Sequence, residues 1–182
     1  MAQEAIVRFY DEMTGKIFGI IRMGTVLGEG MPEKTAANIF IENGLSGKPL
    51  TPFKHSMYRP MLYVDIDDIC NAYALFGKKI LENNVEVHGN SMVHIFNVYH
   101  DQPITIADLA EITKETIIEQ SKGKIVPKIT IMDNGQPNAF NEKDKDLIKI
   151  DTTKALQFLG IKQLKSPRES IRDLVKAKIK TL

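Results

Sequence analysis

Tyr58-Arg-Pro-Met-Leu-Tyr-Val-Asp-Ile-Asp-Asp-Ile-Cys70 is the stretch of sequence that decides the fold. Its apolar centre, residues 61–64, predicts a short strand, and the acidic residues after it predict the start of a helix over residues 66–81. Arg59 stands directly ahead of the strand. A guanidinium in that place suits phosphate binding, because its planar donors match anion oxygens and its charge does not titrate. The alternative is an ordinary ion pair with one of the acidic residues that follow, Asp65, Asp67 or Asp68.

The rest of the chain alternates strand-like and helical patterns. Residues 16–22 and 93–99 are nearly continuous apolar runs, typical of parallel strands covered on both faces. A β-branched run predicts a further strand at residues 125–132, and residues 133–146 read as a polar loop. Apolar spacing and capping residues predict helices at residues 2–13, 33–45, 66–81, 106–119, 151–160 and from 166 onward. No repeat or linker interrupts this order, so we expect residues 1–182 to form a single α/β unit.

Composition excludes several classes of function. The chain has 24 Lys plus Arg against 23 Asp plus Glu, a formal net charge of +1, which gives no electrostatic basis for binding nucleic acid or an anionic membrane. No apolar run reaches the roughly 20 residues that span a bilayer. The single cysteine, Cys70, is expected on the apolar face of its helix and suggests a reducing compartment. We therefore expect a cytoplasmic protein.

The sequence lacks the motifs of self-contained catalysis. Gly24, Gly28 and Gly30 follow the first apolar run, but their spacing is not the Gly-x-Gly-x-x-Gly of a dinucleotide turn. The four histidines show no ligand spacing with one another or with Cys70, so no metal site is expected. We therefore expect no complete set of catalytic residues within this chain alone.

Several motifs, taken in order, resemble the extended short-chain dehydrogenase/reductases, the NAD-dependent epimerase/dehydratase family typified by UDP-glucose 4-epimerase. Arg22-Met-Gly-Thr-Val-Leu-Gly-Glu-Gly is similar to the family's Arg-x-x-Asn-Val-Tyr-Gly-Pro turn, and Arg59-Pro-Met-Leu-Tyr-Val-Asp-Ile-Asp to its Arg-Asp-x-Ile-Tyr-Val-x-Asp-Val. The match continues with Asn43-Gly-Leu-Ser-Gly-Lys-Pro-Leu, Phe96-Asn-Val, Thr105-Ile-Ala-Asp-Leu-Ala and Asp151-Thr-Thr-Lys-Ala. The resemblance implies the C-terminal part of an extended Rossmann-type epimerase, with parallel strands and a small α/β substrate-binding subdomain.

The resemblance also implies which residues bind which group. The family's NAD-binding half and catalytic Tyr-x-x-x-Lys would precede this chain, and none of its five tyrosines has a lysine four residues on. Catalytic residues would then be absent, and NAD would bind only in a complete enzyme. Gly24 would lie near the nicotinamide, and a nucleotide-sugar substrate would contact Thr25, Ala36, Phe53 and Arg59. A turn role for Thr25 and core packing for Phe53 stay as alternatives.

The chain departs from the family pattern in places that bear on its substrate. Leu27, Glu29 and Pro60 stand where the family has Tyr, Pro and Asp. The family's second phosphate-binding Arg has no counterpart in residues 133–146. A diphosphate would then meet one guanidinium instead of two, which leaves the identity of the nucleotide sugar open.

Two functions follow from these observations. One is the substrate-binding portion of an NAD-dependent nucleotide-sugar epimerase or dehydratase, not catalytically complete by itself. The alternative is a non-catalytic binding or interaction module on the same scaffold. The strands at residues 16–22 and 93–99 would leave apolar edges unpaired. We therefore expect a homo-oligomer or a complementary N-terminal NAD-binding chain to cover them and the apolar face of residues 2–13.

Overall fold

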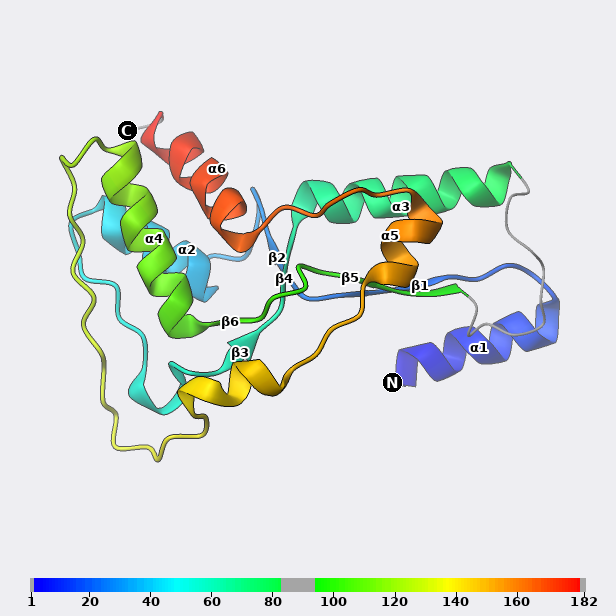
Figure 1. Ribbon diagram of the computed structural model, residues 1–182, viewed down its shortest axis with the longest axis horizontal. Coiled ribbons are helices and arrows are strands. Elements are labelled where there is room, and N and C mark those ends of the chain that lie inside the picture. The colour runs from blue at the N-terminus through cyan, green and yellow to red at the C-terminus, as the bar shows by residue number, and fades with distance from the viewer. Residues whose placement is uncertain (1, 83–93, 181–182) are drawn as a thin grey trace.

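The computed structural model describes residues 2–82 and 94–180 (Figure 1). Its strands form two-stranded sheets. β1 (Ile20–Met23) pairs in parallel with β5 (Ile95–Val98), and β2 (Thr25–Leu27) pairs in parallel with β4 (Tyr63–Asp65). The predicted α/β class with parallel strands is confirmed.

The strand predicted over residues 61–64 is divided at Leu62, which corrects the sequence prediction. The part before it, β3 (Pro60–Met61), pairs antiparallel with β6 (Ile104–Thr105), whereas β4 pairs with β2. The division reflects competition for backbone partners, because the Leu62 carbonyl accepts the Thr25 N–H at 2.7 Å. A step of one residue therefore moves the chain from one sheet to another.

Side-chain caps fix the starts of the two helices that follow the parallel strands. α3 (Ile66–Leu81) has the predicted bounds, and the Asp65 carboxylate caps its first turn. α2 (Ala36–Leu45) begins three residues later than predicted. The cap is Thr35, whose hydroxyl accepts a backbone N–H of the first turn at 3.3 Å. A side-chain acceptor thus fixes this helix start, and Pro32 lies ahead of it.

The later helices follow the sequence signals closely. Capping boxes start α4 (Ile106–Gln120) at Thr105 and α6 (Pro167–Ile179) at Ser166, as predicted. The short α5 (Thr153–Leu159) ends at a glycine with a left-handed backbone, also as predicted. These boundaries depend on local chemistry, which a sequence displays directly.

The sheet of β2 and β4 separates two hydrophobic cores. Tyr63 and Leu27 lie in the first core, with side chains from α2, α4 and α6. Val64 and Val26 pack in the second, with side chains from α3, α5 and β5. The side chains of successive strand residues point to opposite faces of the sheet, so neighbouring residues in one strand pack in different cores.

α1 (Ala2–Thr14) lies at the periphery (Figure 1). A bidentate ion pair between Glu4 and Arg22 joins it to β1, with Nη2 2.7 Å from Oε2. Its exposed apolar side chains are Ile6, Phe9, Tyr10 and Met13. The helix predicted over residues 2–13 is therefore confirmed, and its apolar face is in solvent among the described residues.

Two side chains of α3 are not where the sequence placed them. Cys70 and Tyr73, expected on its apolar face, are exposed, and Tyr73 is half accessible to solvent. The buried stripe runs through Ile69, Ala72 and Phe76. Cys70 and Tyr73 each follow a member of this stripe by one residue, which turns them away from the core.

Some predicted strands are shorter or differently formed. β1 and β5 occupy only part of the runs at residues 16–22 and 93–99, and Met23 at the end of β1 is exposed, so β1 is not covered on both faces. Residues 125–132 make only two isolated bridges, to Leu50 and Phe53. A loop is also expected from the polar residues 83–90, and these residues, like Val93, lie outside the part of the chain that the structure describes. No described helix has the length and apolar character needed to cross a membrane.

Candidate functional site

Gly24 and Thr25 lie against the break between β3 and β4. The Thr25 N–H donates to the Leu62 carbonyl, and Thr25 is the register partner of Tyr63. A Cβ at position 24 would collide with the Leu62 carbonyl oxygen, so the approach requires glycine. The predicted glycine turn is therefore fixed through its backbone to the segment that begins with Arg59.

The Arg59 guanidinium is exposed and has no ion pair among residues 2–82 and 94–180. Its backbone is held after the short helix η1 (Lys54–Ser56), because its N–H donates to the Ser56 carbonyl at 2.9 Å. The ion-pair alternative for Arg59 is wrong. Lys165 binds the three candidate partners instead, Asp65, Asp67 and Asp68.

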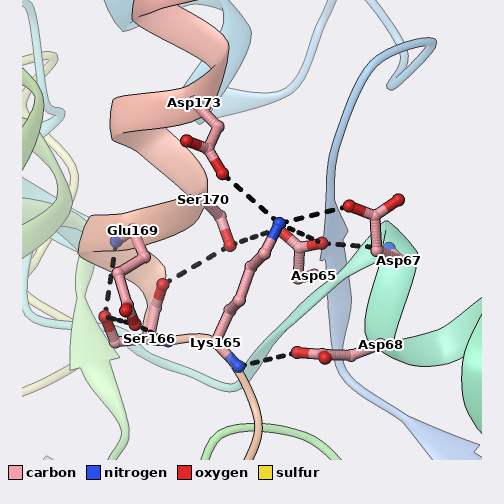
Figure 2. A network of polar contacts seen from close by, with 8 residues as sticks. All are labelled: Asp65, Asp67, Asp68, Lys165, Ser166, Glu169, Ser170 and Asp173. Carbon is pink, nitrogen blue, oxygen red and sulfur yellow. Dashed lines mark hydrogen bonds and ion pairs between the residues drawn. The ribbon is translucent and has the colours of Figure 1, made fainter.

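Lys165 gathers these acidic residues into one network (Figure 2). Its Nζ lies 3.4 Å from Asp65 Oδ1, 3.2 Å from Asp67 Oδ2 and 3.3 Å from Asp173 Oδ2, and its backbone N–H donates to Asp68 Oδ2 at 2.7 Å. Burial lowers the pKa of Lys165, but the hydrogen bonds and charges of the carboxylates outweigh it and raise that pKa. The amine therefore stays charged at neutral pH.

Asp65 is the buried member of the network, at 4% exposure. One oxygen accepts the Ser170 hydroxyl at 2.6 Å, and the other accepts the Asp67 N–H at 2.9 Å. Both oxygens thus have the partners that a buried charge requires. Burial raises the pKa of Asp68 even though the Lys165 N–H opposes this. The network joins the start of α3 to α6 and leaves Arg59 outside it.

Tyr63 follows Arg59 by four residues and is the register partner of Thr25 in the glycine turn. Its side chain lies in the first core at 3% exposure, and burial raises the pKa of its hydroxyl to about 12, while the charge of Arg59 acts in the opposite direction. Gly24 and Thr25 thus meet the segment at Leu62 and Tyr63, and Arg59 lies on the same segment.

Phe53 is exposed, which corrects the core-packing alternative. Its side chain is 46% exposed, and its ring is tilted against His55 with the centroids 5.7 Å apart. An exposed aromatic ring beside a guanidinium-bearing turn can stack on a planar ligand. Ala36 differs, because it is half-buried at the start of α2 and packs against the core that contains Tyr63.

A distant loop lies against the segment that carries Phe53. Lys54 Nζ is 2.7 Å from Asp133 Oδ2, and His55 Nδ1 is 3.2 Å from Asn134 Oδ1. Each pair joins residues 79 positions apart. Sequence reasoning missed Lys54 and His55 as site neighbours, because no spacing rule relates residues so far apart.

The far end of this loop is anchored to α4. Within η3 (Glu142–Leu147), Lys145 Nζ lies 2.8 Å from Asp108 Oδ2. Burial would raise the pKa of Asp108, but hydrogen bonds from Lys145 and from Thr105 outweigh it and lower that pKa. The capping carboxylate of α4 thus also holds the loop, a second role that the sequence pattern did not indicate.

Several clefts lie elsewhere on the surface of the described residues, among them two large ones. One, of about 620 Å³, lies between η3 and the start of α4, and the other, of about 440 Å³, lies between α2, α6 and the loop after β2. Neither is lined by the predicted site residues Gly24, Thr25, Ala36, Phe53 or Arg59. In the part of the chain that the structure describes, no three His, Cys, Asp or Glu residues are grouped to hold a metal ion.

Neither a protein-family model nor a curated protein matches the sequence. Solved structures match the fold. The UDP-glucose 4-epimerase of Thermus thermophilus, in complex with NAD, has a TM-score of 0.71 and 19% identity, covering 100% of this chain and 52% of its own. The UDP-glucuronic acid 4-epimerase of Bacillus cereus, with UDP-glucuronic acid and NAD, has a TM-score of 0.64 and 20% identity, covering 96% and 50%. The dTDP-glucose 4,6-dehydratase of Bacillus anthracis, with NAD, has a TM-score of 0.66 and 15% identity, covering 97% and 49%.

These matches establish the fold. The chain has the architecture of part of an extended Rossmann-type nucleotide-sugar epimerase or dehydratase, and it spans about half the length of those structures. The fold expected from the ordered motifs is therefore confirmed. The bound UDP-glucuronic acid and NAD belong to the matched proteins.

Proposed function

We propose that this chain is the substrate-binding portion of an NAD-dependent nucleotide-sugar epimerase or dehydratase. In such an enzyme the cofactor performs the hydride chemistry, and the protein orients the sugar against it. The fold it shares with the epimerases and a dehydratase supports this assignment. Arg59 would bind the diphosphate of the nucleotide sugar, and Thr25 would donate a hydrogen bond to the same group.

The observation that carries the proposal is that the Arg59 guanidinium has no ion pair within the part of the chain that the structure describes. Three carboxylates lie within nine residues of it in sequence, yet all three are held by Lys165. An exposed arginine whose donors are not engaged by a carboxylate is suited to a bidentate anion. The exposed ring of Phe53 adds a surface on which a nucleobase would stack, and Ala36 would lie beside it.

Catalysis would need a second polypeptide region. The sequence holds no Tyr-x-x-x-Lys pair, so the base that removes a sugar hydroxyl proton would come from an NAD-binding region. Gly24 would then approach the nicotinamide. A complementary NAD-binding chain, or a second copy of this chain, would cover the exposed face of α1 and the exposed end of β1. We place this assembly in the cytoplasm, as expected from the single free cysteine.

Calorimetric titration of the full chain with UDP-glucose tests the proposal. Hydrogen bonds to a charged group contribute about 1.5 to 3 kcal/mol, so Arg59→Ala should weaken binding by roughly 10- to 100-fold. Arg59→Lys keeps the charge but loses the planar fork of donors. Its affinity for UDP-glucose should lie between that of the unaltered chain and that of Arg59→Ala. UDP-glucuronic acid and dTDP-glucose, titrated in parallel, would rank the sugars and bases.

Arg168→Ala is the matched control, because it removes an exposed arginine that is paired with Glu115. It should bind UDP-glucose as the unaltered chain does. Binding that is unaffected by Arg59→Ala would contradict the proposal. So would the absence of binding to any of the three nucleotide sugars at millimolar concentration.

A further inference from the structure

Residues 128–132 form an extended outer segment beside residues 50–54. The two run in parallel, and alternate residues of the outer segment bond to the inner one. The Thr130 N–H donates to the Leu50 carbonyl at 2.9 Å, and the Met132 N–H donates to the carbonyl of residue 52, also at 2.9 Å. We call residues 128–132 the outer edge.

The backbone of Ile129 and Ile131 faces away from the inner segment. In the described ranges, no backbone hydrogen bond uses the N–H or C=O of either residue. This follows from strand geometry, because successive residues of a strand direct their backbone groups to opposite sides. In Figure 1 the outer edge, drawn in yellow-green, runs along the border of the molecule. Its free donors and acceptors are spaced to receive another strand.

The side chains around the outer edge are apolar and basic. Val126, Ile131 and Met132 are exposed apolar residues. Three exposed lysines have no ion pair within the described part of the chain: Lys122, Lys124 and Lys128. The acidic residue that follows, Asp133, is already paired with Lys54. The surface therefore carries uncompensated positive charge beside open backbone groups.

We propose that the outer edge binds an extended, acidic segment of a partner protein by strand addition. The backbone of Ile129 and Ile131 would hydrogen-bond to the added strand, and the three lysines would pair with its carboxylates. A second copy of this chain does not fit. Pairing two identical outer edges would bring the two sets of lysines together, and lysine on an edge discourages such pairing.

A labelled model peptide tests this inference on the full chain. The probe is a fluorescein-labelled twelve-residue peptide of alternating glutamate and valine, and its matched control alternates lysine and valine. Fluorescence anisotropy should show binding of the glutamate peptide alone, and the binding should weaken as salt rises. Hydrogen exchange of the unaltered chain should slow about tenfold at the Ile129 and Ile131 amides with this peptide. The Thr130 and Met132 amides, already bonded, should change little.

Substitutions at the outer edge sharpen the test. Ile131→Pro removes an outward N–H without removing a bond to the inner segment, and it should weaken peptide binding about tenfold. Ile131→Ala keeps that N–H and should retain most of the binding. Lys128→Glu should shift the preference towards the lysine peptide.

Four results would overturn the inference. Three of them are equal binding of both peptides, protection of amides away from residues 129–131, and no binding of the glutamate peptide at millimolar concentration. Protection of Ile129 and Ile131 that grows with protein concentration alone would assign the edge to a second copy and would also reject the acidic partner. The exchange measurement uses the unaltered chain, so the test stands even if Ile131→Pro fails to fold.

Discussion

Lys165 Nζ lies 3.4 Å from Oδ1 of Asp65, a residue 100 positions earlier in the chain. This contact ties the loop before α6 to the start of α3 and gives the buried Asp65 carboxylate a charged partner. Asp65 and Asp67 are both paired with Lys165, and Arg59 lies outside this network.

Lys165→Met should destabilise the fold by about 2 to 3 kcal/mol. The substitution leaves the buried Asp65 carboxylate without its cation. Removing one partner of a buried ion pair destabilises a protein by more than the intact pair stabilises it. The partial exposure of Lys165 reduces this effect. Urea unfolding at neutral pH measures the loss. Lys124→Met, at an exposed lysine with no ion pair to any residue that the structure describes, should change stability by less than about 0.5 kcal/mol. Equal free energies of unfolding for the two variants would contradict a stabilising role for the Lys165 network.

Gly24→Ala should destabilise the chain by about 2 kcal/mol. The added methyl would meet the Leu62 carbonyl and displace its hydrogen bond with the Thr25 N–H. Gly77→Ala is the matched control, because it lies inside α3 with open space around the added Cβ. It should stabilise by about 0.5 to 1 kcal/mol through helix propensity. Thermal unfolding should therefore move in opposite directions for the two variants, and a parallel change would disprove the close approach.

Tyr63 should make the protein less stable in alkali. Its folded pKa of about 12 lies above the ordinary value of 10.0, so between these pH values the unfolded chain loses a proton that the folded chain keeps. The free energy of unfolding should fall by up to roughly 1.4 kcal/mol per pH unit in this window, and Tyr63→Phe should remove that slope. Urea unfolding from pH 9 to 11.5 measures it. Tyr73→Phe, at an exposed tyrosine, should leave the slope unchanged.

Asp108 should contribute to loss of stability in acid. Its pKa is lowered in the folded chain, so its contribution is complete above the ordinary value of 3.8 and is lost as the pH falls through the lower folded value. Asp108→Asn should cost about 1 kcal/mol at pH 7, because Lys145 loses its charged partner. The variant should also show a flatter decline in stability below pH 3.8. Glu111→Gln, which alters an exposed pair with Lys114, should leave the acid profile nearly intact.

The sequence predicted those features that depend on neighbours in the chain. The caps at Thr105 and Ser166 are confirmed, and the helix start expected at the acidic residues is capped by Asp65. Each of these side chains bonds to a backbone group within three residues. The α/β class and the parallel strands could also be predicted from the sequence, since apolar runs and helical spacing of apolar residues indicate directly which residues are buried. The start of α2 was missed by three residues, because Pro32 and Thr35 offered competing signals.

The candidate site was less predictable, because its state depends on distant partners. Sequence alone left Arg59 between a carboxylate and a phosphate, and in the structure Lys165 is the residue that binds Asp65 and Asp67. The sequence likewise left Phe53 between a substrate contact and core packing, and its exposure in the structure excludes core packing. The roles of Gly24, Thr25, Ala36, Phe53 and Arg59 towards ligands stay predictions.

The alternation of Tyr63 and Val64 between two cores limits how this part of the gene can change in length. Inserting or deleting one codon in β4 would exchange the two faces of the strand. The Tyr63 side chain would then point into the second core and the Val64 side chain into the first. Asp65 would leave the reach of Ser170 at the same time. Related sequences should therefore vary in composition here while keeping the spacing of these three positions fixed.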